Sequence, residues 1–175
     1  MDSLSIEDYW IYYCKLMGLD PKTAYNSWSF GDGGVMTQDI LDRVISRQKT
    51  VTTSLVREHE LKGWNMPKVG DKVIILDAND HPRCIIEYSK VIHKRFSDVS
   101  DLDYITSDWG AFDTIDGWRR YLGGMYFQIL AGYGEQFDDS MKVMCIWFTV
   151  IYQFPSNIPS ETISSDIRIR QPSQE

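Results

Sequence analysis

The residue types best suited to chemistry lie between positions 46 and 54, in the segment SRQKTVTTS. Lys49 is followed there by three threonines, Thr50, Thr52 and Thr53. A lysine can contact a phosphate as a point charge, or act as a base when burial or a neighbouring cation lowers its pKa. Threonine hydroxyls can donate hydrogen bonds to phosphates and to base edges. The segment is therefore compatible with a nucleotide pocket, with a hydrolytic site and with an ordinary β-strand.

The distribution of charge around Lys49 is uneven. The formal net charge is −7, which does not suit a generic nucleic-acid coat. Residues 1–42 carry a net −5 and residues 96–175 a net −7, whereas residues 43–95 hold 11 basic and 6 acidic side chains, a net +5. This local positive charge can recruit phosphate, or it can belong to ordinary solvated faces.

Several classes of protein are disfavoured by composition. There is no apolar run near 18 residues, so we expect no transmembrane helix. The first ten residues, MDSLSIEDYW, are acidic and lack the core of a signal peptide, so we expect a cytoplasmic protein. The 3 cysteines and 3 histidines are scattered without metal-ligand spacing, so we expect free thiols, no metal and no cofactor.

The pattern of apolar residues predicts one α+β domain over residues 1–155, followed by a polar tail over 156–175. Helices are expected over 6–17, 37–48, 98–105 and 114–130, with a further short helix opening at Asp20-Pro21. Strands are expected over 50–56, 72–77, 83–96 and 142–154, and loops over 27–34 and 58–71. We expect a small, mostly antiparallel β-barrel or strongly curved sheet with helices packed around it.

The order of several short motifs resembles the ASCH domain family over roughly residues 5–155. The motifs, in chain order, are FGD at 30–32, QKTVTTSL at 48–55, MPKVGDKVIILD at 66–77, HPRCIIEYSKV at 81–91, IDGWRR at 115–120 and MKVMCIWFTVIY at 141–152. The resemblance implies a PUA-like curved β-barrel with flanking helices and a cleft proposed to bind RNA. Some small bacterial relatives are amidohydrolases that deacetylate N4-acetylcytidine, and a nuclease activity has been proposed for others.

The resemblance also implies which residues form the site. The lysine and second threonine of the family's K-T-x-T motif fall on Lys49 and Thr52. The family's catalytic glutamate falls on Gly110, with Asp108 and Asp113 nearby, so the tentative catalytic set is Lys49, Thr52 and Asp108. In a regular strand residues 49 and 52 would point to opposite faces, so the set requires a bend in the backbone.

A site that only binds RNA or a modified nucleotide would use a wider set of residues around Lys49. Aromatic side chains stack on bases, hydroxyls donate to phosphates, and arginines contact phosphates. The candidates of these kinds, together with an acid in the glycine-rich loop, are Trp28, Phe30, Asp32, Thr50, Thr53, Trp118 and Arg119. The first interpretation is thus a binding protein for RNA or a modified nucleotide. The alternatives are an amidohydrolase of N4-acetylcytidine, a ribonuclease, or a protein-interaction domain.

Overall fold

The computed structural model describes residues 5–31, 34–109, 112 and 114–154. Contacts within the chain divide it into two compact units. The first unit comprises residues 1–41, 72–86 and 151–175, and the second comprises residues 42–71 and 87–150. The polar tail predicted over 156–175 lies outside the described residues.

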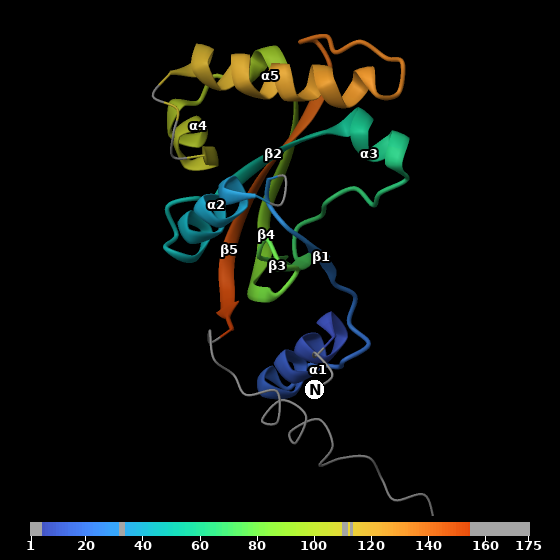
Figure 1. Cartoon of the computed structure of the whole chain (residues 1–175), viewed down its shortest axis with the longest axis vertical. Helices are drawn as coiled ribbons and strands as arrows, with labels where there is room; N and C mark the ends of the chain where they lie inside the picture. Colours follow the sequence, from blue (N-terminus) through green and yellow to red (C-terminus); the bar gives the residue numbers. More distant parts are fainter. Residues whose placement is uncertain (1–4, 32–33, 110–111, 113, 155–175) are drawn as a thin grey trace, which may run out of the picture. The chain divides into compact units, whose positions relative to one another are not determined.

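The described part of the chain contains five strands, with helices before and between them (Figure 1). The helices are α1 (Ile6–Met17), α2 (Val35–Ile45), α3 (Val56–Lys62), the short 3-10 helix η1 (Phe96–Asp98), α4 (Leu102–Trp109) and α5 (Ile115–Ala131). The strands are β1 (Asn26–Trp28), β2 (Val51–Leu55), β3 (Lys72–Leu76), β4 (Pro82–Arg95) and β5 (Lys142–Gln153).

These strands are hydrogen-bonded in the order β1-β3-β4-β5-β2. The sheet is mixed, because β1 runs parallel to β3 whereas β2 runs antiparallel to β5. The helix α2 and the strands β4 and β5 each contribute residues to both units. The α+β class predicted from the sequence is confirmed.

The first unit is built around the amphipathic helix α1. Ser5 caps this helix by accepting a hydrogen bond from Asp8 N, and the Asp8 carboxylate accepts one from Ser5 N at 2.8 Å. The helix ends at Gly18, whose φ of 68° is the left-handed conformation that glycine adopts at little cost. Both helix ends match the sequence prediction. The buried face of α1 presents Trp10, which stacks on Tyr25 with ring centroids 4.6 Å apart.

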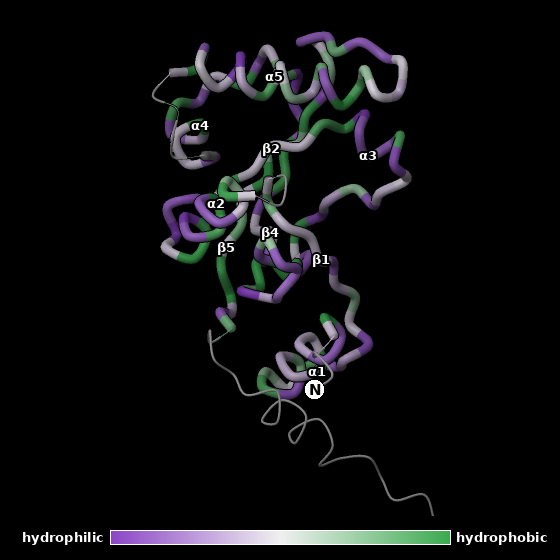
Figure 2. Tube along the Cα trace, viewed as in Figure 1, coloured by the Kyte–Doolittle hydropathy of each residue, from purple (hydrophilic) through white to green (hydrophobic). Residues whose placement is uncertain are grey.

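The second unit has a core between α4, α5 and the sheet. Thr114 caps α5 by accepting a hydrogen bond from Gly117 N, as its position in the sequence predicted. The strand β5 supplies an almost continuous hydrophobic segment (Figure 2), and its residues 143–146 are buried. The buried residues of this core are Val51, Leu55, Phe96, Val99, Tyr104, Ile105, Trp118, Leu122, Tyr126, Leu130, Val143 and Cys145.

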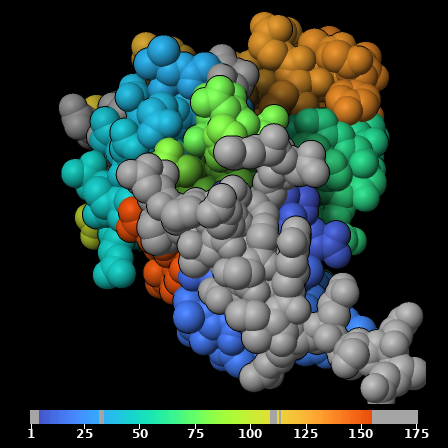
Figure 3. All heavy atoms as spheres, turned by 60° about the horizontal axis from the view of Figure 1, so that its bottom comes forward, coloured from blue at the N-terminus to red at the C-terminus, as the bar shows by residue number. Residues whose placement is uncertain are grey.

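Polar contacts hold α3 in place in the second unit. His59 Nδ1 donates to the carbonyl of Asn65 at 3.1 Å, which leaves Nε2 to accept from the hydroxyl of Ser54 at 2.7 Å. Arg57 forms a bidentate ion pair with Glu135, in which the Nε–Oε2 distance is 2.8 Å. The atoms of α3 accordingly lie beside the orange segment that contains α5 and the turn after it (Figure 3).

The structure corrects several local predictions. The segment after Asp20 forms a turn, not a short helix, because the Asp20 side chain accepts from Lys22 N, and the chain then enters β1. Residues 56–62, predicted mainly as loop, form α3, which the Glu58–Lys62 pair and the left-handed Gly63 stabilise. Thr37, predicted as a cap, is buried in the first turn of α2.

Leu130→Ala is expected to lower the free energy of unfolding by about 2–5 kcal/mol, because it leaves a cavity beside a fully buried position. The matched control is Met125→Ala on the same helix, where the side chain is 37% exposed and the expected cost is below about 1 kcal/mol. Urea denaturation followed by circular dichroism measures both. Equal losses for the two variants would contradict this assignment of the core face of α5.

Candidate functional site

Lys49 lies in the second unit, between the end of α2 and the start of β2. Only 4% of its surface is exposed. Its Nζ donates to the backbone carbonyl of Val51 at 2.8 Å, to the Asp108 carboxylate oxygen Oδ1 at 2.8 Å, and to the backbone carbonyl of Asp108. The side chain is therefore held by a neighbouring strand residue and by the end of α4, 59 positions along the chain.

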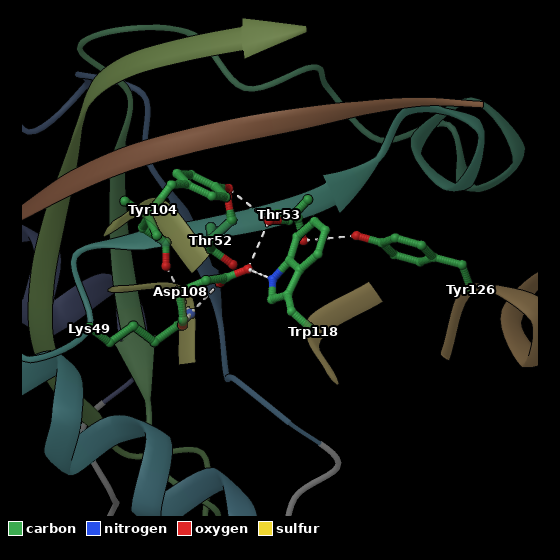
Figure 4. Close-up of polar contacts among 8 residues, drawn as sticks. Lys49, Thr52, Thr53, Tyr104, Asp108, Trp118 and Tyr126 are labelled. Carbon is green, nitrogen blue, oxygen red and sulfur yellow. Dashed lines mark hydrogen bonds and ion pairs between the residues drawn. The ribbon is translucent and has the colours of Figure 1, made fainter. Parts of the chain in front are cut away.

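Asp108 is the acceptor on which the cluster converges. This residue lies in the last turn of α4 and is 5% exposed. One carboxylate oxygen accepts from Lys49, and the other accepts from Thr53 Oγ1 at 2.8 Å and from Trp118 Nε1 at 2.9 Å. Figure 4 shows these three side chains directed toward Asp108 from three parts of the chain. The carboxylate therefore joins β2, α4 and α5 through three side-chain hydrogen bonds.

Two tyrosines attach this cluster to β2. The hydroxyl of Tyr104 on α4 lies 2.7 Å from Thr53 Oγ1 and 2.9 Å from the carbonyl of Thr52. The hydroxyl of Tyr126 on α5 donates to the carbonyl of Thr53 at 3.2 Å (Figure 4). Burial raises the pKa of both phenols, Tyr104 and Tyr126, well above 10.0. Both are therefore neutral donors near neutral pH, and they fix the strand relative to the helices.

The electrostatics of Lys49 are dominated by burial. Loss of hydration lowers the pKa of the Lys49 ammonium below 10.5, and the neighbouring Asp108 carboxylate only partly opposes this shift. Burial disfavours a charged form unless a counter-charge and hydrogen bonds replace water. The cluster thus contains a lysine that releases its proton more readily than an exposed lysine and a carboxylate placed to receive it.

The structure brings together four of the residues singled out from the sequence, namely Lys49, Thr53, Asp108 and Trp118. Thr52 contributes its backbone carbonyl to Tyr104, while its side chain points to the face of β2 opposite that of Thr53, as strand alternation requires. Thr53, rather than Thr52, therefore has the hydroxyl that reaches the acid.

The remaining candidates lie elsewhere. The backbone carbonyl of Thr50 accepts a hydrogen bond from Phe148 N at 2.9 Å. Arg119 donates to the carbonyls of residues 97 and 99, at 2.7 and 3.0 Å, and its buried Nε has no hydrogen-bond partner among the described residues. Trp28 and Phe30 belong to the first unit, where their rings meet edge to face at 4.5 Å. Asp32 and Asp113 lie outside the described residues.

The two tyrosines of the cluster were missed by sequence reasoning. Tyr104 and Tyr126 stand in segments predicted as helical, where an aromatic residue is usually read as core. No short motif marks them, because their partners on β2 are 51 and 73 positions away. The helical periodicity of α4 and α5 places both tyrosines on apolar faces. This periodicity predicts that their rings are buried, but it does not predict which group each hydroxyl contacts.

Among the described residues no group of histidines, cysteines and acids is arranged to hold a metal ion. Nor does this part of the chain contain a helix with the length and apolar character needed to cross a membrane.

A family model for the ASCH domain matches residues 26–152, which is more than half of the chain and includes every residue of the Lys49 cluster. The chain belongs to the ASCH domain family. The family predicted from the sequence motifs is thereby confirmed. A search of functionally curated proteins gave no match.

Two solved structures are similar to this ASCH chain over most of its length. A protein from Enterococcus faecalis V583 is 26% identical, with a TM-score of 0.74, covering 88% of this chain and 97% of its own. An ASCH domain from Lactobacillus crispatus JV V101 is 18% identical, also with a TM-score of 0.74, covering 87% of this chain and 99% of its own. The second likeness supports the fold alone, the curved PUA-like α+β arrangement expected for the family.

Replacing either member of the buried pair should be strongly destabilising. Lys49→Met leaves the Asp108 carboxylate without its ion pair, and Asp108→Asn leaves a buried ammonium without a counter-charge. We expect each to lower the free energy of unfolding by about 3–5 kcal/mol. The double variant should lose less than the sum of the two single losses, because the residues interact directly.

The control for this cycle is Lys62→Met, which removes a partly exposed pair with Glu58 and should cost no more than about 1 kcal/mol. Urea denaturation of the four proteins and the wild type gives the coupling energy. Strictly additive losses would contradict a direct interaction between Lys49 and Asp108.

The lowered pKa of Lys49 predicts a pH dependence of stability. Between the folded-state pKa and 10.5 the unfolded chain binds more protons at this residue than the folded chain, so the contribution of Lys49 to the free energy of unfolding rises with pH. The raised pKa values of Tyr104 and Tyr126 have the opposite effect above pH 10.0, because the unfolded chain then releases protons first.

The contribution of Lys49 is isolated by comparing the wild type with Lys49→Met, since both retain the tyrosines. The stability of the wild type relative to the variant should increase as pH rises toward 10.5. Urea denaturation at a series of pH values measures this difference. A difference that falls across this range would mean that the pKa of Lys49 is raised rather than lowered.

Proposed function

We propose that the cluster of Lys49, Thr53 and Asp108 binds the modified base of a nucleotide or an RNA, and that it hydrolyses the N4-acyl amide of cytidine. One observation carries the proposal: the Asp108 carboxylate accepts from both Lys49 Nζ and Thr53 Oγ1 at 2.8 Å. The family resemblance implies a lysine, a threonine and an acid in one site. Asp108 supports this reading because it supplies an acid although glycine stands at the position where the family has glutamate.

The charge of the cluster favours an uncharged reacting group over a phosphate. The positive charge of Lys49 is already balanced by a carboxylate 2.8 Å away, and both side chains are shielded from water. A phosphate placed here would meet that carboxylate at short range in a medium of low dielectric, where like charges repel strongly. An amide carbonyl and a base nitrogen carry no net charge, so they avoid this repulsion.

The lysine and the carboxylate together can complete the hydrolysis. A water molecule attacks the acyl carbon while Asp108 accepts its proton. The bond between the acyl carbon and N4 then breaks, and N4 takes a proton from the Lys49 ammonium. Asp108 returns its proton to the neutral lysine across the hydrogen bond between them. The sum is acylcytidine plus water giving cytidine plus the carboxylic acid, and the pair recovers its original charges.

The lowered pKa of Lys49 supports this role. A general acid works best when its pKa approaches the working pH, and burial moves the pKa of Lys49 in that direction. Thr53 positions the carboxylate by donating to its second oxygen, a task that Thr52 cannot share from the opposite face of β2. Because the pair is almost fully buried, the substrate must displace a covering side chain as it binds.

The test is chromatographic detection of cytidine after incubation of the purified protein with N4-acetylcytidine. Wild-type protein should release cytidine, and Lys49→Ala and Asp108→Asn should each lower the rate by roughly 100-fold or more, because each removes a proton-transfer group. Thr53→Val should impair turnover more than Thr52→Val. Lys68→Ala, an exposed lysine of the same unit, is the matched control and should retain the wild-type rate.

Absence of turnover by folded wild-type protein would overturn the hydrolase proposal. Calorimetric titration with N4-acetylcytidine then tests the binding proposal alone. If the wild type gives a heat of binding that Lys49→Ala does not, the cluster is a binding site without catalysis. If the wild type gives no heat of binding, the cluster is a structural ion pair.

A further inference from the structure

A second polar feature of this unit lies apart from the Lys49 cluster, where β4 ends and β5 begins. A cavity of about 440 Å³ is lined there by His93, Lys94, Arg95, Asp98 and Lys142, called here the basic cavity. Three lysine or arginine side chains face one acid, so the lining has a net charge of +2 when His93 is counted as neutral. The chain as a whole has a net charge of −7.

The backbone brings these basic residues together from two distant segments. Phe96 N donates to the carbonyl of Met141 at 2.9 Å, directly after β4 and directly before β5. Arg95 and Lys142, each next to one of the bonded residues, are therefore held at adjacent strand ends. Their like charges repel one another, and a bound anion would offset this repulsion.

The basic side chains of the cavity differ from several other cations of the second unit. Three of those cations are paired with acids: Lys49 with Asp108, Arg57 with Glu135, and Lys62 with Glu58. Among the residues that the structure describes, no ion pair joins Lys94, Arg95 or Lys142 to an acid. The basic cavity thus gathers three cations that have no acid partner among the described residues.

We propose that the basic cavity binds the phosphate group of a nucleotide or of an RNA strand. Phosphate offers several oxygen acceptors and up to two negative charges, which match a planar guanidinium donor, two ammonium groups and an imidazole. The cavity is larger than a phosphate ion needs and leaves room for an attached sugar. This site is distinct from the Lys49 cluster, and its binding does not depend on the proposed hydrolysis.

The strand β4 extends the positive charge beyond the cavity. Lys90 and Lys94 are four residues apart on β4, so their side chains leave the same face of the strand. The Lys90 ammonium lies 4.5 Å from the ring centroid of Trp147 on β5. A cationic track with an aromatic ring beside it is typical of surfaces that follow the backbone of single-stranded nucleic acid. This feature favours an RNA strand as the source of the phosphate.

The experiment is fluorescence anisotropy with a short, labelled single-stranded RNA, titrated with wild-type protein, Lys94→Glu, Lys142→Glu and the control Lys68→Glu. The control makes the same change in charge at an exposed lysine outside the cavity. Each cavity variant should weaken binding roughly tenfold and reduce the slope of log K against log salt by about 1, whereas the control should change affinity less than about twofold. Circular dichroism verifies that each variant is folded.

Unlabelled cytidine monophosphate as competitor distinguishes the two sources of phosphate. Displacement of the RNA by the mononucleotide, lost in Lys94→Glu, would support a site for a single nucleotide phosphate. If the mononucleotide does not displace the RNA, while the cavity variants still bind the RNA more weakly, the phosphate comes from an RNA strand. Equal weakening by Lys68→Glu and Lys94→Glu would overturn the proposal, as would failure of the wild type to bind either probe. Neither result depends on turnover of N4-acetylcytidine.

Discussion

The second unit depends on the burial of the Lys49 ammonium beside the Asp108 carboxylate. Removing two charges from water costs several kcal/mol for each ion, and their attraction offsets this cost only with good geometry and further hydrogen bonds. Those bonds come from Thr53 on β2, Trp118 on α5 and the carbonyl of Val51. The position of α4 and the register of β2 are therefore coupled, because displacement of either would leave a buried charge without its partners.

Interactions between near neighbours in the sequence made much of this fold predictable. The capping box at Ser5, the cap at Thr114 and the apolar strand β5 are all signalled within a few residues, and each was found as predicted. The strand β1 was not predicted, because three residues carry little pattern and its partner is β3, 47 positions away in the register. Propensity does not report such distant pairing.

The candidate site was predictable in part. Lys49 was selected from a motif position, and Asp108 from its closeness to Gly110, where the family has glutamate. The sequence does not show that the Asp108 carboxylate lies 2.8 Å from the Lys49 ammonium. The selection of Thr52 followed the family motif, whereas the hydroxyl bonded to Asp108 belongs to Thr53. Strand alternation makes this one-residue difference decisive, since neighbouring side chains face opposite sides of the sheet. Summed charge likewise could not separate buried, paired cations from the exposed group around Lys94.

The core of the first unit is formed by segments that are far apart in the sequence, and this affects how it can form during synthesis of the chain. Its core joins Trp10 near one end, Ile85 in the middle and Phe154 late in the sequence. A ribosome adds residues in order, and segments that emerge early usually fold first. Here the early helix α1 cannot complete its core until Phe154 has left the exit tunnel. Its apolar face therefore stays incompletely covered until Phe154 has been synthesised.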